Sequence, residues 1–427
     1  MTTNTITNAL PRSDNVTREV LANGLTLLIY ENHNVQSVVV SGSLRAGAVY
    51  EDRTRGGTAA MVAGALMSGT QYRDFAAINS ALEDIGAEFS YGAGTFKVGY
   101  NGKALAEDLP VLIDTLADTL MHPTFPDEQV GRLRGERLTW LQYQQQDTRW
   151  QAGRLFRETL YPPHHPFHYS SRGTVQTLPA ITAEDMRRFH ARHYGPDGMI
   201  VVVVGAVESA AVIDLMREKI GGWHNAHQPA RPTLPEIAAR VEAQRVHKTL
   251  SGKTQSDIAL GTTGPSRYAP DYRAAVLANS VLGQFGMMGR IGDVVREREG
   301  MAYYAYSSLD GGFGPGAWRV SAGVNPANVE RAIELIREEL RRITTEPVSQ
   351  SDLEDNQSYF TGRLPLQLET VDGVANILHT IETYDLGLDY LVAYHDEIYA
   401  LTPDDLLAAA ANYLDPSKMV IATSGPD

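Results

Sequence analysis

Two short stretches, ITAEDM at residues 181–186 and LTPDDL at residues 401–406, decide the fold because each begins the same unit of structure. In both, a Thr shortly precedes acidic residues, which is typical of a helix N-terminus: the hydroxyl accepts from a free backbone N–H, and the carboxylates favour the helix dipole. In both, a Tyr, a Pro-containing turn and an apolar run follow, at 199–204 in one copy and 419–423 in the other. Each run predicts a buried strand.

The two copies are related by one constant offset along the chain. It places residue 181 on 401, 199 on 419 and 205 on 425, which is 220 residues each time. Repetition at a fixed offset predicts two related structural units. We therefore predict an α+β protein with two homologous domains, 1–222 and 246–427, joined by a Pro-containing linker at 223–245. Each domain is expected to hold an antiparallel-rich sheet with helices packed on one face. The alternative is that two helix–strand pairs resemble each other by chance.

Hydrophobic periodicity predicts the remaining elements. The expected strands are 25–30, 37–44, 96–100 and 318–324, and the expected helices are 57–67, 76–85, 104–120, 128–159, 329–343 and 352–362.

The composition excludes several classes of function. The chain has 37 Lys and Arg against 51 Asp and Glu, a formal charge of −14, which disfavours nucleic acid and anionic membranes as partners. It has no Cys, so a metal would need His, Asp or Glu ligands. No stretch approaches 18 apolar residues. We expect a cytoplasmic protein, or a periplasmic one if a leader has been removed.

Short motifs run through the chain in a fixed order. They are NGLT at 23–26, SLRAGAVYE at 43–51, GTA at 57–59, MSGT at 67–70, HPF at 165–167, GT at 173–174, YGP at 194–196 and VG at 204–205. In this order they resemble the pitrilysin/insulinase family of zinc metallopeptidases. The resemblance covers nearly the whole chain, and it implies a pair of homologous α+β domains.

The family's zinc motif is degenerate in this chain. Active members carry His-x-x-Glu-His on the helix that begins near residue 57, where ligands at i and i+4 share one helix face and the Glu is the general base. Here Ala60 and Gly64 stand at the two His positions and Ala63 at the Glu position. The third ligand, a Glu, is expected near 141–143, which reads LQY. Neither His-x-x-Glu-His nor His-Glu-x-x-His occurs anywhere in the sequence.

We therefore predict no metal in this chain and no peptide hydrolysis by the chain alone. The small side chains at the degenerate positions could also leave extra volume for a peptide.

A second family feature, an Arg and a Tyr of the C-terminal domain, is retained. The segment VREREGMAY at 295–303 matches the family pattern, and the resemblance assigns the paired positions to Arg296 and Tyr303. Their implied role is donation to a substrate carbonyl and to the oxyanion that forms on it. The alternative is a helix-end ion pair for Arg296 and an ordinary strand aromatic for Tyr303.

Gly92, Gly94 and Gly99 lie where the family presents an edge strand to an extended peptide. A free backbone edge can pair with a peptide, and glycine permits a close approach. The alternative is an irregular hairpin without a role in binding.

Two further motifs are interpreted as structural. The His-rich loop at 164–168 follows two Pro, and adjacent loop histidines rarely converge on one metal. The Gly-rich stretch at 310–316 lacks the Lys and the following helix of a phosphate-binding loop.

The resemblance implies a zinc-free subunit that pairs with a zinc-bearing homologous subunit as a heterodimer and degrades unfolded peptides. The zinc is then expected in the partner. One alternative is a structural relative without a peptidase role, like the family's core subunits of a respiratory complex. Another is a self-sufficient enzyme with an unrecognised site.

Overall fold

The computed structural model describes residues 10–426, which form two compact units. Unit 1 contains the described part of Met1–Leu141 with Ser170–Thr233 and Leu364–Ala393. Unit 2 contains Gln142–Tyr169, Leu234–Arg363 and the described part of Tyr394–Asp427. Each unit therefore includes a segment from the other half of the sequence, which the predicted ranges 1–222 and 246–427 do not describe.

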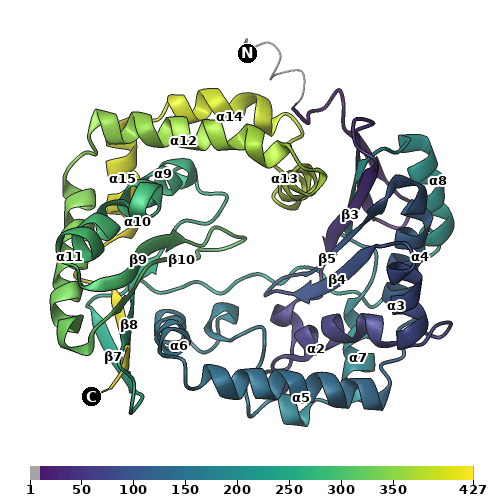
Figure 1. The fold of residues 1–427 in the computed structure, drawn as a ribbon, viewed down its shortest axis with the longest axis horizontal. Coiled ribbons are helices and arrows are strands. Elements are labelled where there is room, and N and C mark those ends of the chain that lie inside the picture. The colour runs from purple at the N-terminus through teal and green to yellow at the C-terminus, as the bar shows by residue number, and fades with distance from the viewer. Residues whose placement is uncertain (1–9, 427) are drawn as a thin grey trace. The chain divides into compact units, whose positions relative to one another are not determined.

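Unit 1 is built on a mixed six-stranded sheet with the order β1-β2-β6-β3-β5-β4. Figure 1 labels β3, β4 and β5 of this sheet. The strands are β1 (Thr17–Val20), β2 (Thr26–Glu31), β3 (Ser37–Leu44), β4 (Glu88–Ala93), β5 (Val98–Leu105) and β6 (Ile200–Gly205). Only the β2–β6 pair is parallel among these neighbours.

Unit 2 repeats this arrangement in a sheet with the order β7-β11-β8-β10-β9. The strands are β7 (Gln244–Thr249), β8 (Ser256–Thr263), β9 (Ala302–Leu309), β10 (Ala317–Val324) and β11 (Val420–Gly425). Here β7 and β11 are the parallel pair. Because β2-β6-β3-β5-β4 and β7-β11-β8-β10-β9 match strand for strand, the prediction of two homologous α+β domains is confirmed.

The two stretches that decide the fold form matching helix starts. Thr182 accepts from the backbone of Asp185 while the Asp185 carboxylate accepts from the backbone of Thr182, at the start of α7 (Ala183–His193). Thr402 and Asp405 make the same reciprocal pair at α15 (Pro403–Tyr413). Such a capping box satisfies two free N–H groups of the first helical turn.

The other helices of each unit pack around its sheet. In unit 1 they are α2 (Thr58–Ala65), α3 (Phe75–Glu83), α4 (Leu109–Met121), α8 (Ser209–Lys219) and α13 (Val371–Thr383). In unit 2 they are α6 (Thr148–Leu160), α9 (Tyr272–Gly283), α10 (Phe285–Gly292) and α11 (Val329–Thr345). Three run from one unit into the other along the chain: α5 (Asp127–Gln144), α12 (Gln350–Leu368) and α14 (Tyr390–Tyr399).

Several predicted helices have different bounds, and two of them differ in kind. The prediction of one helix over 128–159 is wrong, because the chain leaves α5 at Gln144 and begins α6 at Thr148. Asp147 has extended backbone and accepts from the N–H of Trp150, so it starts a new helix. The prediction of a helix from 104 is also wrong at its start, because β5 continues to Leu105.

One helix in each unit comes from the other half of the sequence and packs on the sheet face opposite the main helical layer. In unit 2, Ile258 and Leu260 of β8 face the core formed with α9 and α11, whereas Ala259 between them packs against Phe156 of α6. In unit 1, α13 packs in the same way, with Leu378 in one cluster with Leu28 and Val202. The halves of the sequence thus exchange equivalent helices.

Within residues 10–426, every helix is too short or too polar to cross a bilayer.

Candidate functional site

The degenerate motif lies on α2, whose N-terminus is held by a buried carboxylate. Glu51 accepts from the backbone N–H of Gly57 (2.8 Å) and of Ala59 (2.6 Å). Gly57 has φ +100°, a backbone conformation that favours glycine and turns the chain into the helix. Burial raises the pKa of Glu51 to about 7, although the two N–H groups act in the opposite direction.

The three motif positions offer no ligand atom. Ala60 and Ala63 are buried, whereas Gly64 is exposed. A methyl group or a hydrogen atom has no lone pair, so these side chains can neither bind zinc nor act as a general base. The residues present therefore do not fit the metal that this helix would hold.

A guanidinium group lies beside these positions. Arg137 of α5 donates from Nη2 to the carbonyl oxygen of Ala60 at 3.1 Å. A Cβ placed on Gly64 would lie only 2.5 Å from the same nitrogen. Burial lowers the pKa of Arg137, and Arg172 adds to this effect. The space left by the missing side chains is thus partly filled by a cation, which reduces the volume that we expected for a peptide.

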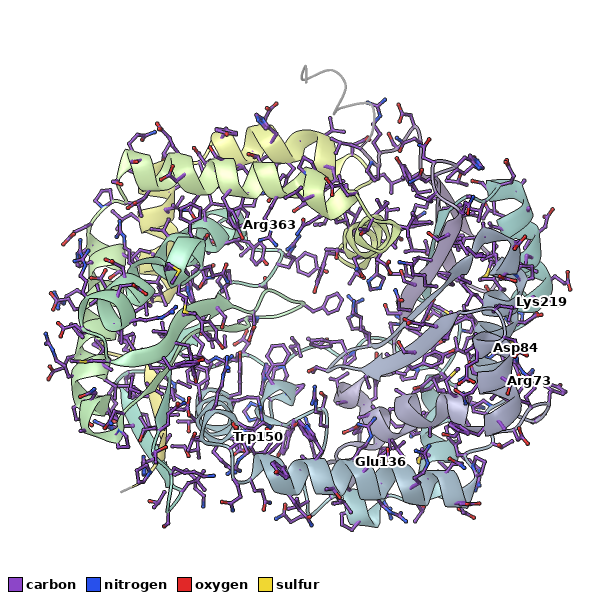
Figure 2. All side chains as sticks on the ribbon, viewed as in Figure 1. Arg73, Asp84, Glu136, Trp150, Lys219 and Arg363 are labelled. Carbon is purple, nitrogen blue, oxygen red and sulfur yellow. The ribbon has the colours of Figure 1, made fainter. Side chains whose placement is uncertain are left out.

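Arg137 was not predicted from the sequence. The third ligand position was expected near 141–143, and Leu141 is buried one turn after Arg137 on α5. Figure 2 labels Glu136, the neighbour of Arg137, on this helix. Residues 133, 137 and 141 share one helix face, because they are four residues apart. The arginine could therefore have been predicted from its position one helical turn before residue 141.

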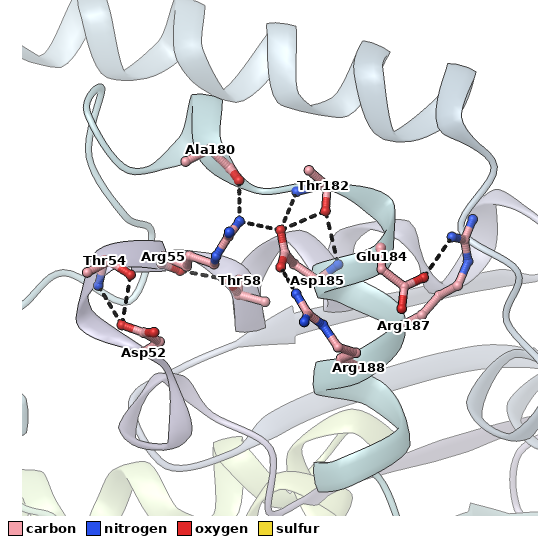
Figure 3. Close-up of polar contacts among 10 residues, drawn as sticks. All are labelled: Asp52, Thr54, Arg55, Thr58, Ala180, Thr182, Glu184, Asp185, Arg187 and Arg188. Carbon is pink, nitrogen blue, oxygen red and sulfur yellow. Dashed lines mark hydrogen bonds and ion pairs between the residues drawn. The ribbon is translucent and has the colours of Figure 1, made fainter.

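A polar network fixes α7 against the segment before α2 (Figure 3). The carboxylate of Asp185 binds both Arg55 and Arg188, in addition to its capping partner Thr182. Arg55 also donates to the carbonyl oxygen of Ala180. These contacts hold the turn from which α2 begins.

The three predicted peptide-binding glycines occupy different places. Gly92 lies on β4, an edge strand of its sheet, and pairs with Gly99 on the next strand inward. Gly94 lies in the turn after β4, where its N–H donates to the carbonyl of Lys97 at 2.8 Å. Only Gly92 is therefore on the strand whose free edge could pair with a peptide, and α2 packs beside that strand.

Arg296 lies in a π-helical segment, Asp293–Arg298. Its guanidinium is about one-third exposed and lies 3.6 Å from the carboxylate of Glu297. The segment is followed by Gly300 (φ +62°), after which the chain enters β9. Single π-helical turns are rare and recur at functional sites.

Tyr303 is the second residue of β9, an edge strand of the second sheet. Its side chain is 86% exposed. The π-helical segment packs against β9, so Arg296 and Tyr303 belong to adjacent elements. No hydrogen bond joins their side chains in the part of the chain that the structure describes. The two residues therefore lie on neighbouring elements, and the Tyr303 side chain is exposed to solvent.

One other group of side chains within residues 10–426 could hold a metal ion. Its candidate ligands, Glu31, His33 and Glu208, have their ligand atoms within 4.8 Å of one another, and all three residues are exposed. The Glu31 carboxylate also accepts from the N–H of Ser209. In the His-rich loop, the His168 ring bonds to the carbonyl of Tyr161 at 2.8 Å, which is a structural role.

The chain matches two sequence profiles of one peptidase family. Residues 26–161 match "Insulinase (Peptidase family M16)" and residues 180–359 match "Peptidase M16 inactive domain". An uncharacterized zinc protease of Streptomyces coelicolor is 28% identical over 95% of this chain and 89% of that protein. The mitochondrial-processing peptidase subunit beta of Saccharomyces cerevisiae is 23% identical over 94% of this chain and 88% of its own length.

A solved structure shares the fold. The peptidase M16 inactive domain from Pseudomonas fluorescens has a TM-score of 0.86 and 24% identity, covering 97% of this chain and 98% of that one. Together, the matching profiles, the repeated sheet and the degenerate motif on α2 establish that this chain belongs to the insulinase (M16) family of peptidases.

Proposed function

We propose that this chain is the zinc-free subunit of a two-chain metallopeptidase that degrades unfolded peptides. The observation that carries the proposal is α2, on which Ala60, Ala63 and Gly64 stand where ligands and base would be, with the guanidinium of Arg137 beside them. A chain with this helix needs a homologous partner to supply the metal, and the zinc would polarise the scissile carbonyl and activate water there.

This chain would contribute a pair of hydrogen-bond donors. Arg296 is permanently charged, and the phenol of Tyr303 is an exposed donor. Directed at a peptide carbonyl, they would stabilise the negative charge that develops on its oxygen. One positioned donor of this kind contributes about 3–4 kcal/mol to transition-state stabilisation.

The chain would also help to hold the peptide. An extended peptide can pair with the free edge of β4, where Gly92 is exposed and a Cβ would meet no atom within 4 Å. Backbone pairing is independent of side chains, which suits a subunit that handles unfolded peptides of varied sequence.

The proposal is tested by mixing the purified chain with a zinc-bearing homologue from the same genome. Co-elution of the two chains and peptide cleavage well above that of the homologue alone are expected. Arg296→Ala should lower kcat/KM of the mixture about 100-fold or more. Arg298→Ala is the matched control, because Arg298 lies in the same segment, is exposed and pairs with Asp293.

A mixture that is no faster than the homologue alone, together with an inert Arg296→Ala variant, would refute the proposal. These two results would favour the alternative that the chain is a structural relative without a peptidase role. We place the pair of subunits in the cytoplasm, or in the periplasm if a leader precedes the chain.

A further inference from the structure

A polar pocket of about 430 Å³ lies within unit 2, between α6 and strands β8, β9 and β10. Figure 2 labels Trp150, which lines it from α6. Four arginines and two aspartates contribute to its wall: Arg149, Arg154, Arg157, Arg319, Asp147 and Asp257. Its lining includes no residue of α2 and neither Arg296 nor Tyr303.

Both carboxylates of the pocket are already engaged by uncharged donors. Asp147 caps α6 by accepting from the N–H of Trp150 at 2.6 Å. Asp257 is buried and accepts from the hydroxyls of Thr148 (2.5 Å) and Tyr304 and from the amide of Gln255. Neither aspartate forms an ion pair with an arginine of the pocket.

Two of the arginines are engaged as well. Arg154 pairs with Glu158 (3.2 Å) and donates to Gln151. Arg149 stacks on the ring of Tyr304, 4.4 Å from its centre, and donates to the hydroxyl of Tyr306 at 2.7 Å.

Arg157 and Arg319 are the two arginines of the pocket that neither pair with a carboxylate nor stack on an aromatic ring. Arg157 donates from Nε to the carbonyl of His168 at 3.3 Å, and the Nε of Arg319 is buried with no hydrogen-bond partner. Within residues 10–426 neither guanidinium forms an ion pair. Gly153 on α6 lies beside Arg319, since a Cβ there would make an ordinary contact with its Nη1 at 3.6 Å.

The two guanidinium groups also repel each other. Burial lowers the pKa of Arg157, and the nearby charges of Arg154 and Arg319 add to this effect, while Glu158 and Tyr161 oppose it. Burial raises the pKa of Asp310, and the charge of Arg319 opposes this effect, although the two described side chains form no ion pair. Half-buried like charges without a counter-ion are costly for a folded protein, and a bound anion would relieve that cost.

We propose that Arg157 and Arg319 bind an oxyanion in this pocket, namely a carboxylate of the peptide that the proposed function above assigns as substrate. Guanidinium groups bind carboxylates through paired, charge-assisted hydrogen bonds. The carboxylate comes from a peptide C-terminus or from an Asp or Glu side chain. Inorganic phosphate offers the same chemistry from another source.

The test measures binding to the isolated full chain by titration calorimetry at low salt. Three short, otherwise uncharged peptides are compared: one with a free C-terminal carboxylate, one amidated, and one amidated with a single internal Glu. Inorganic phosphate is titrated separately. At least one carboxylate-bearing peptide should bind about tenfold more tightly than the neutral peptide.

Arg157→Gln and Arg319→Gln should each abolish this preference for a carboxylate. Arg154→Gln is the matched control and should keep it, because Arg154 already has a counter-ion in Glu158. Thermal unfolding gives a second readout: the carboxylate peptide should raise the Tm of the wild type and leave that of Arg319→Gln unchanged. If the arginine has only a structural role, its replacement by glutamine lowers the Tm but leaves the preference for a carboxylate unchanged.

Equal binding of the acidic and neutral peptides by the wild type overturns the proposal, even if a variant fails to fold. Retention of the preference by both glutamine variants also overturns it. If the chain binds phosphate but neither of the two carboxylate-bearing peptides, the assignment of the ligand as a peptide is overturned. No step of the test requires cleavage or a partner chain, so its result is independent of whether the two-chain peptidase activity exists.

Discussion

The Nη2 atom of Arg137 donates a hydrogen bond to the carbonyl oxygen of Ala60 at 3.1 Å, which joins α5 to the helix where the family carries its zinc motif. The helix that lacks the zinc ligands therefore has an arginine side chain beside it. A fixed positive charge occupies part of the volume in which active relatives would hold a metal.

Restoring the motif alone should not restore tight zinc binding. The triple variant Ala60→His, Ala63→Glu, Gly64→His supplies two ligands and a base, but Arg137 remains beside them as a like charge. Adding Arg137→Glu should tighten zinc binding at least about tenfold relative to the triple variant, equivalent to about 1.4 kcal/mol. Metal analysis and titration calorimetry measure the difference. Equal zinc affinity for the two variants would show that Arg137 does not oppose the metal.

Substitution of Gly64 by Ala should be tolerated. The new Cβ would meet the end of the flexible Arg137 side chain, which can move away, and Ala is favoured over Gly in a helix by about 1 kcal/mol. That gain offsets the weakened hydrogen bond to Ala60. Thermal unfolding should give a Tm close to that of the wild type. A large loss of stability would mean that Arg137 is fixed in place.

Replacement of the Tyr303 hydroxyl should affect activity but not folding. The side chain is 86% exposed, so Tyr303→Phe should leave the Tm of the chain unchanged. In the mixture with a zinc-bearing homologue, kcat/KM should fall up to about 100-fold, because a donor to the oxyanion is lost. Tyr72→Phe is the control, since Tyr72 is 72% exposed and lies in the other unit. An identical effect of both substitutions would argue against a role for Tyr303.

Substitutions in the two capping boxes should destabilise the protein to different extents. Thr182→Ala and Thr402→Ala should each lower the free energy of unfolding by about 1 kcal/mol. Asp185→Asn should cost more than Asp405→Asn, because Asp185 is buried and also binds Arg55 and Arg188. Denaturant unfolding of the four variants tests this order. Equal losses for the two Asn variants would show that the two arginines do not contribute to the free energy of unfolding.

Glu51 should make the protein less stable as the pH rises. Burial raises its pKa from 4.5 to about 7, so between these values the folded state binds this proton more tightly than the unfolded state does. The free energy of unfolding then falls from pH 4.5 to pH 7. Denaturant unfolding across this range should give a flatter profile for Glu51→Gln than for the wild type. A profile for the variant that is as steep as that of the wild type would assign the pH dependence to other groups.

Local patterns in the sequence predicted much of the fold. The valine-rich runs became β3 and β6, and the Thr–Asp spacing gave both capping boxes. The break between α5 and α6 was missed because helical periodicity continues on both sides of it, although Asp147 before Thr148 is an N-cap signal. Which sheet a helix covers was not predictable either, since periodicity shows that a face is buried and not what buries it.

The candidate site was predicted only where a motif defines it. Ala60, Ala63 and Gly64 were found by comparison with a fixed spacing, and so were Arg296 and Tyr303. Arg157 and Arg319 lie on elements that meet through tertiary packing, and no spacing along the chain relates them. Arg137 lies one helical turn before the expected ligand position at 141, but the sequence does not show that it reaches Ala60.

The exchange of α6 and α13 has a consequence for synthesis on the ribosome. The last strand of the first sheet ends at Gly205, but α13, which covers one face of that sheet, begins at Val371. At about 5–20 residues per second, translation of the intervening chain takes on the order of ten seconds or more. During that interval Leu28, Val39 and Val202 lack the helix that covers them in the folded protein, so this apolar face of the nascent chain stays exposed to water.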